Sequence, residues 1–219
     1  MVLDEHRETA DRVLVPMAGK MRNINPDHLS ALAIILAALA GLLFYLSGTW
    51  YWLLIVAVAA LMGSALMDAL DGKVAKLTGK ANIRGDFLDH VLDRYADIFL
   101  IVGIIMSGYC NWFLGILALT GVFMTSYLGT QAQAVGVKRD YGGILGRADR
   151  LVLMMLVPLI LWGMLFFWNI SVLVTLPYLE IPLTLFDIMF IWFAIAGHFT
   201  AMQRAIRVWR ELTLRQKKA

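Results

Sequence analysis

Cysteine and charged residues are scarce in this chain. Cys110 is the only cysteine among 219 residues, so no internal disulfide can form. Charged residues make up 16% of the chain and hydrophobic residues 60%. This balance places the chain among membrane proteins, and nothing in it indicates a nucleic-acid partner.

Long apolar runs predict the fold. A transmembrane helix needs about 20 apolar residues, and six segments approach or exceed that length. We therefore expect an all-α, polytopic membrane protein in which a single domain covers 1–219. Residues 1–29 would form an N-terminal amphipathic helix on the membrane surface, with Val13, Leu14 and Met17 among its apolar residues. Residues 30–210 would form a six-helix core, with predicted spans at Ser30–Ser47, Trp50–Leu70, Phe87–Met106, Trp112–Ala132, Leu151–Trp168 and Pro182–Met202.

Lysine and arginine are distributed unevenly around these spans. They precede the first span, lie between the second and third, and follow the fourth and the sixth. The turns at 48–49, 107–111 and 169–181 contain neither residue. Because cytoplasmic loops carry an excess of basic residues, both termini and the charged connections are predicted to face the cytoplasm. The basic balance also suits an anionic inner leaflet and anionic substrates.

Four carboxylates interrupt the apolar pattern near the second and third spans. Asp68 and Asp71 are three residues apart, so they would share a helix face. Asp89 and Asp93, four apart, would do the same. Since carboxylates in a membrane are costly, they need a cation or an ionic substrate. Two Mg²⁺ or Mn²⁺ ions per active site, about 4 Å apart, could hold a pyrophosphate here, whereas zinc is not expected because His90 is isolated.

The spacing of this segment is Asp68-x2-Asp71-Gly72-x2-Ala75-Lys76-x8-Gly85-x3-Asp89-x3-Asp93. It resembles the signature of the CDP-alcohol phosphotransferase family at nearly every fixed position. The family has arginine where this chain has Lys76, which keeps the positive charge but loses the planar fork. The segment 26–30 also resembles the family's start of the first span, with Asp27 where asparagine often stands.

The resemblance implies roles for individual residues. The implied metal ligands are Asp68, Asp71, Asp89 and Asp93. Asp93 would also be the catalytic base. The implied contacts with a CDP-linked lipid are Asp68, Gly72, Ala75, Lys76 and Gly85, and a homodimer is the expected assembly. Taken alone, Gly72 fits a helix C-terminus as well as a close approach of the nucleotide.

Three later segments, 126–134, 142–151 and 200–210, resemble the inositol-phosphate branch of the family, most closely its archaeal form. They imply transfer of an archaetidyl or phosphatidyl group from CDP-archaeol or CDP-diacylglycerol to inositol 1-phosphate, with release of CMP. The expected acceptor-phosphate ligands are Arg147, Arg150 and Arg204, because guanidinium groups supply both charge and geometry. Gln131 and Gln133 are expected to contact ring hydroxyls or to bridge helices.

Alternatives stay open at this stage. Topology alone would make the three arginines positive-inside anchors. Bacterial members carry basic residues where Gly129 and Gln131 stand here, so another acceptor, such as glycerol 3-phosphate or serine, is the second choice. A cation transporter would be a function of another class. Asp97 and Arg94 are expected to be structural partners, since unpaired buried charge is costly.

Overall fold

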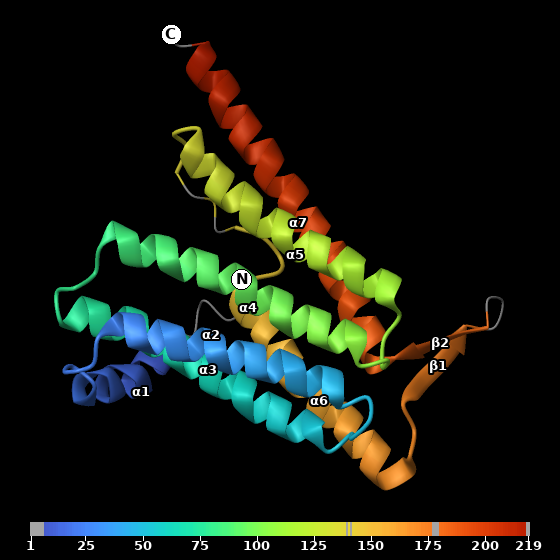
Figure 1. The fold of residues 1–219 in the computed structure, drawn as a ribbon. Helices are drawn as coiled ribbons and strands as arrows, with labels where there is room; N and C mark the ends of the chain where they lie inside the picture. The colour runs from blue at the N-terminus through green and yellow to red at the C-terminus, as the bar shows by residue number, and fades with distance from the viewer. Residues whose placement is uncertain (1–6, 139, 141, 177–179, 218–219) are drawn as a thin grey trace.

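The computed structural model describes residues 7–138, 140, 142–176 and 180–217 (Figure 1). Within these ranges the chain is almost entirely helical, with one short antiparallel hairpin. The elements are α1 (Arg7–Lys20), α2 (Pro26–Leu46), α3 (Leu53–Leu77), α4 (Ile83–Met106), α5 (Trp112–Ala134), α6 (Arg147–Trp168), β1 (Val172–Leu176), β2 (Ile181–Thr184) and α7 (Leu185–Gln216). The predicted fold class, a helical polytopic membrane protein, is confirmed.

Five of the described helices, α2, α3, α5, α6 and α7, are long and apolar enough to cross a membrane. The 24-residue helix α4 is of comparable length, but its first half is charged. Its charged residues are Arg84, Asp86, Asp89, Asp93, Arg94 and Asp97. The expected count of six spans, with α4 as the third, therefore stays a prediction.

The helices pack in two groups, which are connected by α6 and by a contact between α4 and α5. Helix α2 lies along both α3 and α4, α5 lies along α7, and α6 contacts α3 and α7 (Figure 1). Backbones approach very closely between α2 and α4: a Cβ added to Gly103 would lie 2.1 Å from the Gly41 carbonyl oxygen. This approach holds the charged half of α4 beside the start of α2 and the end of α3.

A continuous apolar core joins the two groups. Its largest fully buried side chains come from α2, α3, α4 and α7 as well as α6: Phe44, Leu54, Leu61, Leu100, Ile101, Met154, Phe186, Phe190 and Phe193. Many other apolar side chains point outward from the spanning helices, as expected where lipid replaces water.

The predicted N-terminal helix is present as α1 and packs against α3. Leu14 and Met17 join a small apolar cluster with Val74 of α3, and Asp11 pairs with Lys73 at 2.6 Å. One side of α1 thus contacts protein, while Val13 remains exposed. Its position on a membrane surface stays a prediction.

The start of the sixth predicted span was wrong. Pro182 does not begin a helix but lies in β2, paired with Thr175 of β1, and the hairpin projects from the helices (Figure 1). Helix α7 begins only at Leu185, because Thr184 and Asp187 cap it reciprocally: the Thr184 N–H donates to Asp187 Oδ2 at 2.8 Å, and the Asp187 N–H donates to Thr184 Oγ1 at 3.2 Å. It then runs to Gln216, well beyond Met202.

Candidate active site

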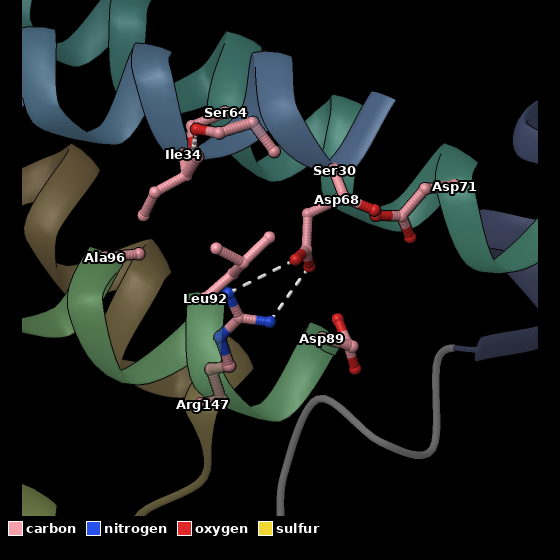
Figure 2. Close-up of a pocket in the computed structure, with 10 residues that line it drawn as sticks. Ser30, Ile34, Ser64, Asp68, Asp71, Asp89, Leu92, Ala96 and Arg147 are labelled. Atoms are coloured by element: carbon pink, nitrogen blue, oxygen red, sulfur yellow. Dashed lines mark hydrogen bonds and ion pairs between the residues drawn. The ribbon is translucent and has the colours of Figure 1, made fainter. Parts of the chain in front are cut away.

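The C-terminal part of α3 and the N-terminal part of α4 bring the aspartates together beside α2 (Figure 2). One carboxylate oxygen from each of Asp68, Asp71 and Asp89 lies within 4.8 Å of the others. They line a pocket together with Ser30 and Arg147. The remaining walls are Ala33, Ile34, Ser64, Leu92 and Ala96, so the carboxylates face a space with apolar sides.

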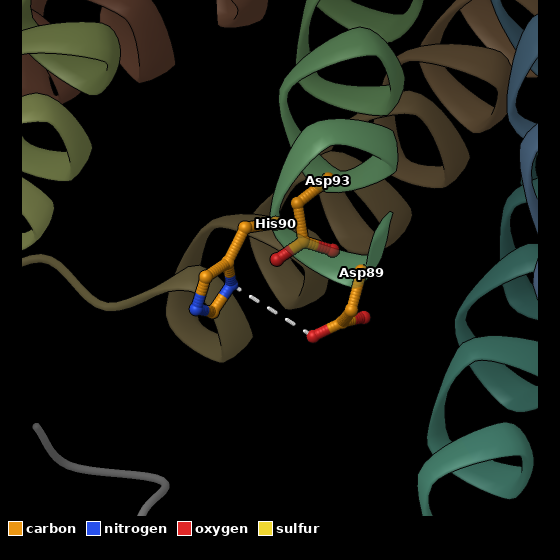
Figure 3. A group of neighbouring side chains, drawn as sticks. All are labelled: Asp89, His90 and Asp93. Carbon is orange, nitrogen blue, oxygen red and sulfur yellow. Dashed lines mark ion pairs between the residues drawn. The ribbon is translucent and has the colours of Figure 1, made fainter. Parts of the chain in front are cut away.

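A second group on α4 shares one aspartate with the first. Ligand atoms of Asp89, His90 and Asp93 also lie within 4.8 Å of one another (Figure 3). His90 Nδ1 is 3.9 Å from Asp89 Oδ2, and His90 Nε2 is 3.7 Å from Asp86 Oδ1. The sequence interpretation treated His90 as isolated, although Asp86 precedes it by one helical turn, a spacing that indicates contact.

Two further side chains hold the carboxylates in place. The Ser30 hydroxyl, from the first turns of α2, donates to Asp71 Oδ2 at 2.5 Å. Arg147, the first residue of α6, places Nη1 2.9 Å from Asp68 Oδ2 and 2.6 Å from Asp93 Oδ1. Arg147, predicted at the acceptor phosphate, thus bridges the carboxylates of α3 and α4. Figure 2 shows its contact with Asp68.

A buried charge network continues from the pocket along α4. Asp97, which is 1% exposed, accepts from Arg150 Nη2 at 3.2 Å, and Arg94 Nη2 lies 3.3 Å from the same oxygen. Arg94 also donates to the Ser126 hydroxyl of α5. The expectation that Asp97 and Arg94 are structural partners is confirmed. Arg150, predicted at the acceptor phosphate, contacts the same oxygen of Asp97.

The electrostatic balance of the site favours cations. Five carboxylates, those of Asp68, Asp71, Asp89, Asp93 and Asp97, lie near three guanidinium groups, those of Arg94, Arg147 and Arg150. Among the described residues, no group donates a hydrogen bond to Asp93 Oδ1, although it lies in the ion pair with Arg147. An excess of oxygen ligands with negative charge fits a hard divalent cation.

Arg204 occupies a different environment on α7. It is 6% exposed, and it donates from Nε to the Gly142 carbonyl at 3.0 Å and from Nη1 to the Thr125 carbonyl at 2.5 Å. A Cβ at Gly129 would lie 2.9 Å from Arg204 Nη1, so a side chain at this position would have to displace the Arg204 guanidinium. Gln131, in contrast, is exposed in the last turn of α5, as is Gln133.

The nucleotide-side residues lie around the end of α3. Gly72 is inside the helix rather than at its end, and a Cβ there would meet nothing within 4 Å. The glycine that follows the helix is Gly79, with φ of +69°. Ala75 is half-buried and Lys76 exposed one turn after Gly72, whereas Gly85 lies in the first turn of α4 and donates its N–H to the Asn82 side chain at 3.0 Å.

Comparison with known proteins agrees with this geometry. The family model described as CDP-alcohol phosphatidyltransferase matches residues 23–186. The chain belongs to the CDP-alcohol phosphatidyltransferase family. The match includes the aspartate segment and both arginines at the start of α6, whereas α1 and most of α7 lie outside it.

Named members of the CDP-alcohol phosphatidyltransferase family are similar over most of the chain. Archaetidylinositol phosphate synthase of Methanothermobacter thermautotrophicus is 33% identical over 213 residues, which cover 96% of each chain. The crystal structure of Mycobacterium tuberculosis phosphatidylinositol phosphate synthase with CDP-DAG bound has a TM-score of 0.70 at 23% identity and covers 90% of this chain and 94% of that one. The structure of the same enzyme in complex with manganese and citrate has a TM-score of 0.69 at 22% identity and covers 90% of this chain and 88% of that one. The predicted family and fold are confirmed.

Proposed function

We propose that this family member transfers an archaetidyl or phosphatidyl group from a CDP-linked lipid to inositol 1-phosphate and releases CMP. The observation that carries the proposal is the aspartate pocket, in which Asp68, Asp71 and Asp89 converge from two helices. The archaeal relative aligned with 96% of this chain is named for inositol phosphate transfer, and the bacterial structural neighbour was solved with a CDP-lipid. CDP-archaeol and CDP-diacylglycerol are the candidate donors.

Two divalent cations, Mg²⁺ or Mn²⁺, are proposed as cofactors, with Asp68, Asp71, Asp89 and Asp93 as their ligands. The close carboxylate oxygens and the excess of negative charge support this set. When bound, such ions neutralise a diphosphate and stabilise both the attacking and the leaving oxygen.

Asp93 is the proposed catalytic base. The acceptor hydroxyl oxygen attacks the phosphorus that carries the lipid, a new P–O bond forms, and the hydroxyl proton passes to Asp93. The bond between that phosphorus and the oxygen bridging to CMP then breaks, and CMP leaves with the bridging oxygen. The Arg147 guanidinium lies 2.6 Å from Asp93 Oδ1, beside the site of the proposed proton transfer.

The donor lipid is proposed to bind at the end of α3. The open space beside Gly72 lets the nucleotide approach the backbone of α3. The exposed Lys76 supplies a positive charge for the diphosphate. Asp68, Ala75 and Gly85 complete the proposed donor contacts.

Arg147, Arg150 and Arg204 are proposed to bind the acceptor phosphate, with Gln131 and Gln133 near the inositol ring. Arg94 and Arg150 share one carboxylate oxygen of Asp97, and Arg94 also lies 3.7 Å from Asp93 Oδ2. Each guanidinium has five N–H donors, so it can hold these carboxylates and still contact an acceptor phosphate.

Orientation and assembly are proposed on sequence grounds. Because cytoplasmic loops carry an excess of basic residues, both termini and the aspartate pocket are proposed to face the cytoplasm, where nucleotide-activated substrates are found. The chain is proposed to act as one domain and to form a homodimer, as the family resemblance implies.

The test is a transfer assay with purified protein. CMP release is measured with CDP-archaeol or CDP-diacylglycerol and, in parallel, inositol 1-phosphate, free inositol, glycerol 3-phosphate or serine. We expect turnover that requires a divalent cation and depends on inositol 1-phosphate. Turnover with glycerol 3-phosphate or serine instead would contradict the acceptor, and cation flux without CMP release would favour a transporter.

A further inference from the structure

The segment between α5 and α6 leads directly into the arginines of the site. Its described residues, 135–138, 140 and 142–146, contain no helix or strand, yet Arg147 follows Gly146 and begins α6. The segment is attached to one face of α7 through Thr200, Arg204 and Arg207. These residues are four and three apart, so their side chains project from the same side of the helix.

Thr200 holds the end of the segment nearest α6. Its hydroxyl oxygen accepts from the N–H groups of Ile144 at 3.1 Å and Leu145 at 3.5 Å. A Cβ at Gly143 would lie 2.1 Å from Thr200 Cγ2, and its φ of +147° also favours glycine. Leu145 is 1% exposed and belongs to the main apolar core, so this end of the segment is fixed by packing as well.

Arg207 holds the middle of the segment at two points. Its Nε donates to Asp140 Oδ2 at 2.5 Å and its Nη2 to the Gly142 carbonyl at 3.2 Å. Asp140 in turn accepts from the Gly142 N–H at 2.8 Å, which closes a ring of three hydrogen bonds. The Gly142 carbonyl also accepts from Arg204.

The charge state of Asp140 suits this ring. Partial burial by itself would raise the pKa of the Asp140 carboxyl, but hydrogen bonds from Arg207 and from the Gly142 N–H outweigh that effect and lower the pKa below its usual value. Asp140 is therefore ionised at neutral pH, and the contact with Arg207 is charge-assisted.

We propose that Asp140 and Arg207 are positioning residues for the acceptor side of the active site, because they fix the segment that sets Arg147 and Arg150 against the aspartates. The inference rests on the proposed function. Neither residue touches the aspartate pocket; both act through Gly142 and the residues that follow it. Only a short link joins Gly142 to Arg147. It enters α6 through the Gly146 N–H, which donates to Asp149 Oδ2 at 3.0 Å, so the position of Gly142 determines where α6 begins.

An exposed ion pair alone would contribute little to stability. Here, however, the Asp140 side chain is only 19% exposed. In addition, both Asp140 and Arg207 hydrogen-bond to the backbone of Gly142, so the pair holds the segment as well as the two side chains. Its loss should therefore displace the acceptor arginines without unfolding the helices, which predicts a selective effect on the acceptor.

The experiment uses full-length protein purified in detergent and compares Asp140→Asn, Arg207→Gln and the double variant. Arg210→Gln is the matched control, since it removes the same charge from an exposed position three residues further along α7. Each single variant should raise the KM for inositol 1-phosphate about three- to tenfold and leave the KM for the CDP-lipid within about twofold of wild type. The double variant should be no worse than the poorer single variant, because both remove the same interaction.

The inference fails if the two single effects multiply in the double variant, if both KM values rise together, or if Arg210→Gln behaves in the same way. Hydrogen exchange supplies a second measurement that needs no substrate. The Ile144 and Leu145 amides should exchange faster in Arg207→Gln than in Arg210→Gln.

The two measurements separate the inference from the proposed function. If wild type does not use inositol 1-phosphate, the proposed function fails and the acceptor role inferred here fails with it, whatever the exchange rates. If wild type uses inositol 1-phosphate while Arg207→Gln leaves exchange or the acceptor KM unchanged, only the positioning role is overturned.

Discussion

Arg147 Nη1 lies 2.6 Å from Asp93 Oδ1, so the first residue of α6 contacts the proposed base on α4. The same guanidinium nitrogen is 2.9 Å from Asp68 Oδ2 on α3. One cation therefore connects three helices at the point where donor and acceptor are proposed to meet. An acceptor phosphate bound by Arg147 would lie beside the carboxylate that takes the acceptor's proton, which links binding to proton transfer.

Replacing a pocket aspartate should abolish turnover. Asp68→Asn, Asp71→Asn and Asp89→Asn each remove a charge from a shared cluster of oxygen ligands. CMP release is measured at saturating Mn²⁺, with membrane expression checked. Asp86→Asn is the matched control, because Asp86 lies on α4 but its side chain is 71% exposed and outside both metal-binding groups. Full activity in one pocket variant would refute an essential role for that residue.

Asp93→Asn should separate chemistry from binding. If Asp93 is the base, turnover should fall by about two orders of magnitude or more, while CDP-lipid binding falls much less. Equilibrium binding and turnover are measured on the same sample. Equal losses in both quantities would leave Asp93 as a binding residue only.

The sequence predicted the aspartate pocket because helical periodicity alone fixes which side chains share a face. Asp68 and Asp71 lie on one helix and Asp89 and Asp93 on the next, and the structure brings the two faces together. The partners of Arg147 could not be predicted in this way. They depend on how α6 packs against α3 and α4, and no local pattern encodes that arrangement.

Two local signals in the sequence indicate features that the predicted spans leave out. Val172, Val174 and Thr175 are β-branched and favour a strand, which ends the loop before α7 in a hairpin instead of a turn. His90 follows Asp86 by four residues, a spacing that indicates contact on a helix. In both cases the short-range spacing carried information, whereas the ion pair of Arg150 and the backbone contacts of Arg204 depend on tertiary packing.

Gly103→Ala should destabilise the protein and distort the pocket. The new Cβ would lie 2.1 Å from the Gly41 carbonyl oxygen, so α2 and α4 must separate, at a cost of about 1–3 kcal/mol. Thermal unfolding in detergent is the measurement. Gly163→Ala is the control, because a Cβ at that position of α6 meets nothing within 4 Å and should be neutral or slightly stabilising. Equal melting temperatures in the two variants would contradict the close α2–α4 contact.

Lys76→Ala should weaken binding of the CDP-lipid, whereas Lys76→Arg should keep or improve it. The arginine restores the family's residue and its forked donor. The apparent affinity for CDP-lipid is measured for both variants at fixed acceptor concentration. An unchanged affinity in Lys76→Ala would show that this exposed lysine only faces solvent.

Arg150→Ala and Arg204→Ala test the acceptor site. A charge-assisted phosphate contact is worth about 1.5–3 kcal/mol, so each variant should raise the half-saturating concentration of inositol 1-phosphate about ten- to hundredfold and leave the CDP-lipid value near wild type. Arg150 is 2% exposed and pairs with Asp97, so Arg150→Ala should also lower the melting temperature, and its kinetics are compared at a temperature where it stays folded.

Arg204→Ala removes the hydrogen bonds to the backbone carbonyls of Gly142 and Thr125, so its melting temperature is measured as well. Arg210→Ala on the same helix controls for the loss of positive charge. If Arg204→Ala and Arg210→Ala raise the half-saturating concentration equally, long-range attraction explains the effect and Arg204 has no direct contact with the phosphate. A large effect confined to Arg204→Ala would support direct contact if the KM for the CDP-lipid and the exchange of the Ile144 and Leu145 amides are both unchanged.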